Sequence, residues 1–172
     1  MPHTIDWEKL AHGLGAIADT PDGRTENGGT RVATAALAEI LGDDAMTAAV
    51  DHYVSNRPGS EAARSVLTLL KPGAAIEHCH HIYLTSGTPR ERNFAVNLLK
   101  SIGDKRVLAW LPQYLSDPNP GIQAWGVGIP EHLLLNGVVE LEDLLPLLES
   151  LSDHPNPVVR EKAAEILTWE RD

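Results

Sequence analysis

The sequence predicts an all-α protein, a right-handed α-solenoid of about five antiparallel helical hairpins. Residues 41–59 and 102–121 are two copies of one segment, with Tyr53 and Tyr114 at equivalent positions and an offset of 61 residues. A period near 30 residues, seen here doubled, is typical of chains that stack helical hairpins. Apolar or small residues also recur three to four positions apart along most of the chain, as in helices that bury one stripe.

At 172 residues the chain is long enough for a single domain, predicted to span 1–172. Residues 1–29 are expected to form an N-terminal helix and a polar loop, and residues 30–170 the helical repeats. The loop covers 19–29, and no strand is expected. Helices are predicted at 5–17, 30–41, 44–55, 59–70, 73–84, 89–101, 104–116, 120–134, 139–151 and 157–170.

Three of the predicted helices begin with a proline, whose missing N–H costs nothing at the first helical position. The preceding residues Thr88, Asn119 and Asn156 are expected to cap these helices through their side-chain oxygens. Thr88 and Glu91 also match the spacing of a capping box. These signals fix where the second helix of each hairpin should start.

Glycines are expected at several helix ends, where they can adopt a left-handed conformation. The four positions are Gly42, Gly73, Gly103 and Gly137. Gly126, Gly128 and Pro130 instead fall inside the predicted helix 120–134, where the proline is expected to cause a kink. The favoured interpretation is that small residues here allow neighbouring helices to approach closely, and the alternative is a kinked helix that shapes a ligand cleft.

Two segments near the C-terminus carry a recognisable repeat motif. LPQYLSDPNPGIQ at 111–123 and LPLLESLSDHPNPVVREKAAEIL at 145–167 resemble the HEAT repeat. The resemblance implies a HEAT-like or ARM-type superhelix, with charge-assisted bonds between a turn Asp and a second-helix Arg joining successive repeats. The matching positions are Pro112 and Pro146 for the first-helix proline, Asp117 and Asp153 for the turn, and Arg92 and Arg160 for the arginine.

The composition excludes several classes of function. A net charge of −10 and a pI near 5.2 argue against a nucleic-acid partner, and they suit a basic protein partner or simple solubility. Cys79 is the single cysteine, so an internal disulfide is excluded. The N-terminal MPHTIDWEKL resembles no signal peptide and no apolar run reaches 18 residues, so a cytoplasmic protein without a membrane partner is expected.

The leading functional hypothesis is a non-catalytic scaffold or adaptor that binds another protein. No catalytic motif is present and no cofactor is expected, whereas solenoids offer an extended concave face lined by the second helix of each hairpin. The oligomeric state is left open. The residues expected on this face are Glu91, Asn93, Asn97, Lys100, Gln123, Trp125, Glu131, Glu161 and Glu165.

Two alternatives belong to other classes. The acidic stretch 131–153, with Glu140, Glu142 and Asp143, would suit an immunity or inhibitor protein that blocks a basic toxin or nuclease. The HEAT resemblance also raises a tetrapyrrole lyase or another ligand-handling protein, with Trp125 beside the interrupted helix as its apolar cleft. Base excision, another HEAT-like activity, would need a basic groove that the composition does not supply.

The run from Glu77 to His81 holds the densest set of metal-ligand residue types. Glu77, His78 and His81 would share one helix face, and zinc would accept that set. No second cluster accompanies it, so no metal site is expected. The preferred interpretation is a helix face that presents His78 and His81 to a partner.

Overall fold

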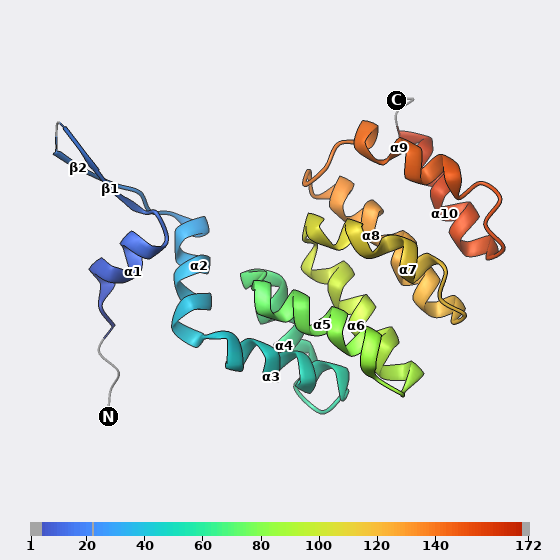
Figure 1. Cartoon of the computed structure of the whole chain (residues 1–172), viewed down its shortest axis with the longest axis horizontal. Coiled ribbons are helices and arrows are strands. Elements are labelled where there is room, and N and C mark those ends of the chain that lie inside the picture. The colour runs from blue at the N-terminus through green and yellow to red at the C-terminus, as the bar shows by residue number, and fades with distance from the viewer. Residues whose placement is uncertain (1–4, 22, 170–172) are drawn as a thin grey trace.

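The computed structural model describes residues 5–21 and 23–169, and this part of the chain is mostly helical, as predicted (Figure 1). Its elements are α1 Trp7–Gly13, β1 Ile17–Thr20, β2 Gly23–Glu26, α2 Thr30–Leu41, α3 Asp43–Val54, α4 Ser60–Leu70, α5 Gly73–Thr85, α6 Pro89–Ile102, the 3₁₀ helix η1 Lys105–Trp110, α7 Leu111–Leu115, α8 Pro120–Leu135, α9 Leu141–Ser150 and α10 Pro157–Leu167.

A short β-hairpin replaces the end of the first predicted helix and the start of the predicted loop. β1 and β2 pair antiparallel, with Ile17 opposite Glu26 and Thr20 opposite Gly23. Helix α1 ends before Gly15, which adopts a positive φ of 64°, and Gly23 has a φ of 125° beside the turn. The prediction that the chain contains no strand is therefore wrong, because these two glycines stop the helix and let the chain reverse.

Helices α3 to α10 pack as two rows. α3 contacts α5 in one row, and α5 reaches α7 through His80 and Tyr83, which bond to Tyr114 and Gln113. In the other row α4 contacts α6, α6 contacts α8, and α8 contacts α10. Each helix also packs against its successor across the rows, as in the pairs α3–α4, α5–α6, α7–α8 and α9–α10.

One cluster of buried side chains lies between the two rows and extends from Met46 to Ile166. The N-terminal elements contribute little to it, because every side chain of α1 and α2 is at least partly exposed. Figure 1 shows the hairpin and α1 standing apart from the two rows, joined to them through α2. Burial of apolar surface therefore stabilises mainly α3 to α10.

The predicted asparagine caps are confirmed. Asn119 Oδ1 accepts a hydrogen bond from the Gly121 amide at 2.9 Å, at the start of α8. Asn156 Oδ1 accepts one from the Val158 amide at 3.0 Å, at the start of α10. In both helices the first residue is the proline that the sequence placed there, so capping and proline together set these two boundaries.

The predicted capping box at Thr88 is wrong. Within the described residues the Thr88 side chain makes no capping hydrogen bond. Ser86 takes the place of Glu91 in the box, because its Oγ accepts from the Thr88 amide at 3.0 Å and donates to Glu91 Oε2 at 2.6 Å. The Glu91 carboxylate is thereby tied to the turn between α5 and α6.

Three of the four predicted glycine ends are found, with positive φ angles at Gly42, Gly103 and Gly137. Gly73 is different, since it begins α5 rather than ending α4. Lys71 instead adopts the left-handed conformation, with a φ of 48°, and ends α4 ahead of Pro72. A proline cannot continue a preceding helix easily, so the left-handed residue lies two positions before the predicted glycine.

Helix α8 is continuous from Pro120 to Leu135 despite its internal proline. A Cβ added to Gly126 would lie 3.1 Å from Tyr114 Cβ, and one added to Gly128 would lie 3.1 Å from Lys100 Cε. These glycines therefore let α7 and the Lys100 side chain approach α8 closely, in agreement with the favoured interpretation. The predicted helix 104–116, by contrast, is divided into η1 and the short α7.

Within residues 5–21 and 23–169, no helix combines the length and the apolar character that a bilayer-crossing segment requires.

Candidate functional site

A large open hollow lies along the row formed by α4, α6 and α8. We call it the Trp125 groove, and its volume is about 780 Å³. A second hollow of about 350 Å³ continues it between α8 and α10 and shares Lys100 and Trp125 with it. The residues that line the groove are Arg64, Ser65, Thr68, Leu69, Asn97, Lys100, Ser101, Trp125 and His132.

Trp125 is held in a fixed orientation at the junction of the two hollows. Its indole Nε1 donates to Asn93 Oδ1 at 2.8 Å, and the Lys100 Nζ lies 5.4 Å from the centroid of its ring. Asn93, Asn97 and Lys100 follow one another at helical spacing along one face of α6. The indole is only partly buried, so this arrangement presents an oriented aromatic face with a cation beside it.

The lining of the groove is positively charged. Arg64 and Lys100 belong to it, and among the described residues no Asp or Glu does. Lys71 lies close by, because both its Nζ and the His132 ring are within 4 Å of the position that a Gly103 Cβ would occupy. The pKa of His132 is lowered, first by burial and then by the charges of Lys100 and Lys71. His132 is therefore held as a neutral imidazole beside two ammonium groups.

The cations of the groove differ in their partners. Arg64 forms an ion pair with Glu61 at 2.6 Å, one turn away on the exposed side of α4. Lys100 makes no ion pair with any described residue, its contact being the Trp125 ring. Lys162, beyond α8, bonds to Glu131 at 2.9 Å and to Glu165 at 2.7 Å, and these bonds raise its pKa. Of the two lining cations, Lys100 is thus the one without an acidic partner among the described residues.

The residues predicted for the binding face divide into distinct groups. Asn97, Lys100 and Trp125 line the groove, and Glu131 lines its continuation. Asn93 accepts the hydrogen bond that orients the Trp125 indole. Glu165 is engaged by Lys162, and Glu161 is exposed on α10 outside the lining of either hollow.

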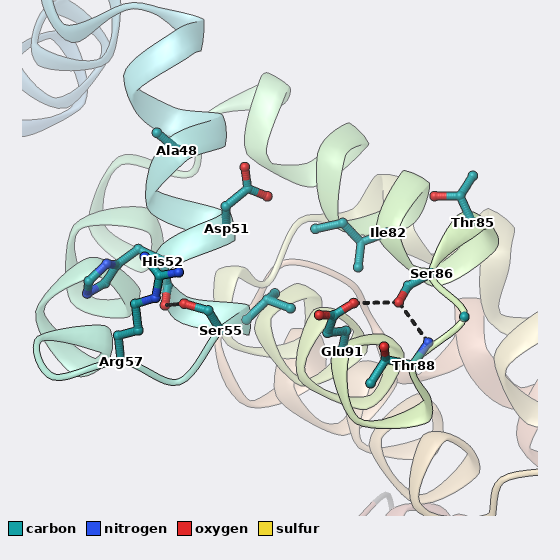
Figure 2. A pocket seen from close by; sticks show the side chains of 12 residues that line it. Ala48, Asp51, His52, Ser55, Arg57, Ile82, Thr85, Ser86, Thr88 and Glu91 are labelled. Carbon is teal, nitrogen blue, oxygen red and sulfur yellow. Dashed lines mark hydrogen bonds between the residues drawn. The ribbon is translucent and has the colours of Figure 1, made fainter.

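Gln123 and Glu91 lie elsewhere. Gln123 Nε2 donates to the Asp117 carbonyl at 2.7 Å, and its Oε1 accepts from Asn156 at 2.8 Å. Gln123 therefore links two interhelical turns. Glu91 lines a separate hollow of about 640 Å³ between α3, α5 and the start of α6 (Figure 2).

The hollow in Figure 2 is lined by both polar and apolar groups, and several of the polar groups bond locally. His52 Nε2 lies 3.0 Å from the Pro58 carbonyl, Ser55 Oγ donates to the His52 carbonyl at 2.9 Å, and Ser86 bonds to Glu91. Each of these bonds satisfies a group at a helix end or turn. This hollow is accordingly a seam between helix ends, and the Trp125 groove is the stronger candidate site.

The sequence did not indicate the α4 side of the groove. Arg64, Ser65, Thr68 and Leu69 belong to a helix on which the HEAT resemblance is weakest, and Lys162 lies beyond it on α10. A usable signal was present, because Arg64 and Thr68 are one turn apart on a face of α4 beside the buried Leu67. Their approach to Trp125 depends on the packing of α4 on α6.

The metal candidates do not assemble into a site. His78 Nε2 bonds to Asp51 Oδ1 at 2.7 Å, His81 stacks beside it at a ring separation of 6.4 Å, and Glu77 is exposed. Across the described residues no group of three or more His, Cys, Asp or Glu side chains is arranged to hold a metal ion. His78 instead joins α5 to α3.

The rest of the Glu77–His81 run is structural. His80 stacks on Trp110 with ring centroids 3.9 Å apart and bonds to the Tyr114 hydroxyl at 2.8 Å. Cys79 is fully buried, and burial raises the pKa of its thiol. A thiol held in its protonated form is a poor nucleophile, so these residues connect α5 to η1 and α7.

Asp117 accounts for the charged pair that the HEAT resemblance implied. Its carboxylate is buried and accepts from the Asn119 amide at 2.8 Å and from the Tyr83 hydroxyl at 3.2 Å, with Arg92 Nη1 at 3.5 Å. Burial and the Asp117 charge raise the pKa of Tyr83 to about 12. The implied partner of Asp153 is not found among the described residues, since Arg160 donates to the carbonyls of His154 and Pro155.

The acidic patch of Glu140, Glu142 and Asp143 is exposed at the start of α9. Carboxylates at this end of a helix interact favourably with its dipole, which gives them a local role.

No protein-family model, curated protein or solved structure matches this chain. The function is therefore argued from the geometry of its own residues.

Proposed function

We propose that this chain is a non-catalytic binding module that holds part of another protein in the Trp125 groove. The observation that carries this proposal is the oriented, partly exposed indole of Trp125 with Lys100 beside it, at the junction of two hollows. Tryptophan and arginine are the side chains that most often dominate binding energy at protein interfaces. Because Asn93 fixes the indole, little side-chain entropy is lost when a partner covers it.

Exposed apolar side chains extend the surface on either side of Trp125. Leu69 on α4 is 61% exposed and lines the groove, and Val158 on α10 is 50% exposed and lines its continuation. An apolar centre with a polar rim is the arrangement found in specific protein interfaces. The groove with its continuation is long enough to touch three or more helices, which suits an extended segment.

We further propose that the architecture is a HEAT-like α-solenoid. The alternation of contacts between the two helix rows and the repeated proline-asparagine starts of α8 and α10 support it. In such an architecture the second helices of successive hairpins form one face. That face here would be the one formed by α4, α6, α8 and α10.

The test is a comparison of three versions of the full chain used as affinity baits. Proteins retained by the wild type should be retained by the Leu84→Ala control, which removes an exposed side chain of α5, and lost with Trp125→Ala. Thermal melts of all three establish that the variants fold. A set of retained proteins that ignores Trp125→Ala would contradict the proposal.

The acidic patch supports a second candidate, an inhibitor of a basic protein. Glu140, Glu142 and Asp143 are exposed on α9, away from the residues that line the groove. Reversal of all three charges would abolish binding if the inhibitor reading holds and would leave groove binding unchanged. The tetrapyrrole alternative would need a pigment bound at Trp125, which an absorption shift on titration with a bilin would reveal.

A further inference from the structure

The charge of the Trp125 groove is opposite to that of the whole chain. The sequence holds 24 acidic and 14 basic residues, so a surface hollow of average composition would be acidic. The described lining instead contains Arg64 and Lys100 and no Asp or Glu, and the Lys71 ammonium and the His132 ring both lie close to Gly103. A pocket that reverses the sign of its protein selects ligands of the opposite charge.

The two lining cations are also available for exchange. The ion pair between Arg64 and Glu61 lies at the surface, with 71% of the Glu61 side chain exposed, and such pairs contribute little to stability. Lys100 pairs with no described acid and rests against Trp125. An arriving carboxylate can therefore bind either cation without breaking a buried interaction.

The apolar part of the groove restricts the ligand further. Leu69 and the Trp125 ring line the same hollow as the two cations. A ligand that satisfies all four side chains carries negative charge and an apolar group within one short segment. An acidic stretch of polypeptide with an aliphatic or aromatic residue has this composition.

We infer that the Trp125 groove binds an extended acidic segment of a partner protein, with carboxylates at Arg64 and Lys100 and an apolar side chain on Trp125 and Leu69. This inference rests on the proposed function and specifies its partner. It differs from the expectation drawn from composition, which was a basic partner, because the groove and the whole chain carry opposite charge.

A polypeptide fits these observations better than a nucleic-acid strand. Single-strand binding combines stacking on aromatic rings with a continuous basic track along the backbone. Beyond Trp125 the track is interrupted, because Glu131 and Glu165 surround Lys162. The net charge of −10 would also repel a strand with one negative charge per nucleotide.

The experiment is a selection of random 12-residue peptides on the full chain, followed by fluorescence anisotropy of the selected peptides. Affinities are compared for wild type, Trp125→Ala, Lys100→Glu, Lys100→Gln and the control Lys105→Glu. The control makes the same charge change as Lys100→Glu at an exposed position outside the groove. A 12-nucleotide single-stranded DNA serves as competitor. Melting curves establish that each variant is folded.

We expect the selected peptides to be rich in Asp and Glu around one apolar residue. Their affinity should fall roughly tenfold or more with Lys100→Glu, less with Lys100→Gln, and less than about twofold with Lys105→Glu. It should also weaken as the salt concentration rises.

The other results separate this inference from the proposed function. Peptides that need Trp125 and Lys100 but are neutral or basic would overturn the acidic partner and leave the groove as a binding site. Peptides that ignore both residues would overturn the inference and the proposed function together. Displacement of acidic peptides by the oligonucleotide at lower concentration than by the unlabelled peptide would assign the groove to nucleic acid and overturn both.

Discussion

Replacement of Asp117 by alanine tests whether this buried carboxylate is structural. Asp117 accepts hydrogen bonds from the Asn119 amide at 2.8 Å and from the Tyr83 hydroxyl at 3.2 Å, and Arg92 Nη1 lies 3.5 Å away. Asn119 in turn caps α8, so the carboxylate holds the turn that starts the central groove helix. The substitution leaves the Asn119 amide without its acceptor, whereas the Tyr83 hydroxyl keeps the Gln113 carbonyl at 3.1 Å.

The size of the effect follows from these contacts. A hydrogen bond to a charged group contributes about 1.5–3 kcal/mol, and loss of one partner of a fully buried ion pair costs about 3–5 kcal/mol. The Arg92 side chain is 26% exposed and can regain water, so the lower part of the combined range applies. We expect Asp117→Ala to lower the free energy of unfolding by about 3 kcal/mol, which at this chain length lowers Tm by about 6–12 °C.

The assay is urea unfolding followed by far-UV circular dichroism, with a thermal melt as a second measurement. Asp153→Ala is the matched control, since Asp153 is an exposed aspartate in the turn before α10, and it should change stability by less than about 0.5 kcal/mol. Asp117→Asn keeps one acceptor oxygen and should fall between the two. A loss below about 1 kcal/mol for Asp117→Ala would refute the structural reading and return the residue to consideration as a functional group.

Two further predictions concern packing and ionisation. Gly126→Ala should destabilise the protein by about 1 kcal/mol, because a clash of about 1–3 kcal/mol with Tyr114 Cβ outweighs a gain in helix propensity of about 1 kcal/mol. Gly128→Ala should cost less, because the flexible end of the Lys100 side chain can move away from the added methyl group. Equal losses in the two variants, measured by urea unfolding, would show that contact with Tyr114 is not the cause. Tyr83 should ionise near pH 12 in the native protein, with the Tyr83→Phe difference in absorbance at high pH identifying its signal. Since the usual pKa is about 10, Tyr83 contributes stability below pH 10 that is lost as the pH rises towards 12, and a Tyr83 transition near 10 in folded protein would contradict this.

Local signals in the sequence predicted much of the helical framework. The starts of α8 and α10 follow from an asparagine and a proline in succession, and these boundaries depend only on residues within one turn. The capping-box spacing of Thr88 and Glu91 was misleading, because Ser86 Oγ accepts from the Thr88 amide that Glu91 would otherwise bond. Where two side chains compete for one donor, the path of the chain before the helix decides between them.

The β-hairpin shows a second limit of the prediction. The sequence has Asp-Gly at 22–23, which is a strong hairpin signal. The segments on either side are short and mostly polar, so they do not resemble buried strands. β2 is fully exposed, so its stability comes from pairing with β1 rather than from an apolar stripe. Because β2 buries no apolar stripe, hydrophobic periodicity in the sequence does not predict this hairpin.

By itself the sequence determined that the chain is mostly helical and where several helices begin and end. It also predicted that Trp125 and Lys100 share one binding face. Only the tertiary structure decided that Arg64, Leu69 and His132 join them in one groove and that Glu91 and Gln123 do not. Helix formation depends on residues three or four positions apart, whereas the groove joins α4, α6 and α8 across tens of residues. The charge of the groove is likewise a property of packing, because the chain as a whole is acidic and only the arrangement of the helices places Arg64 and Lys100 in a lining without a described Asp or Glu.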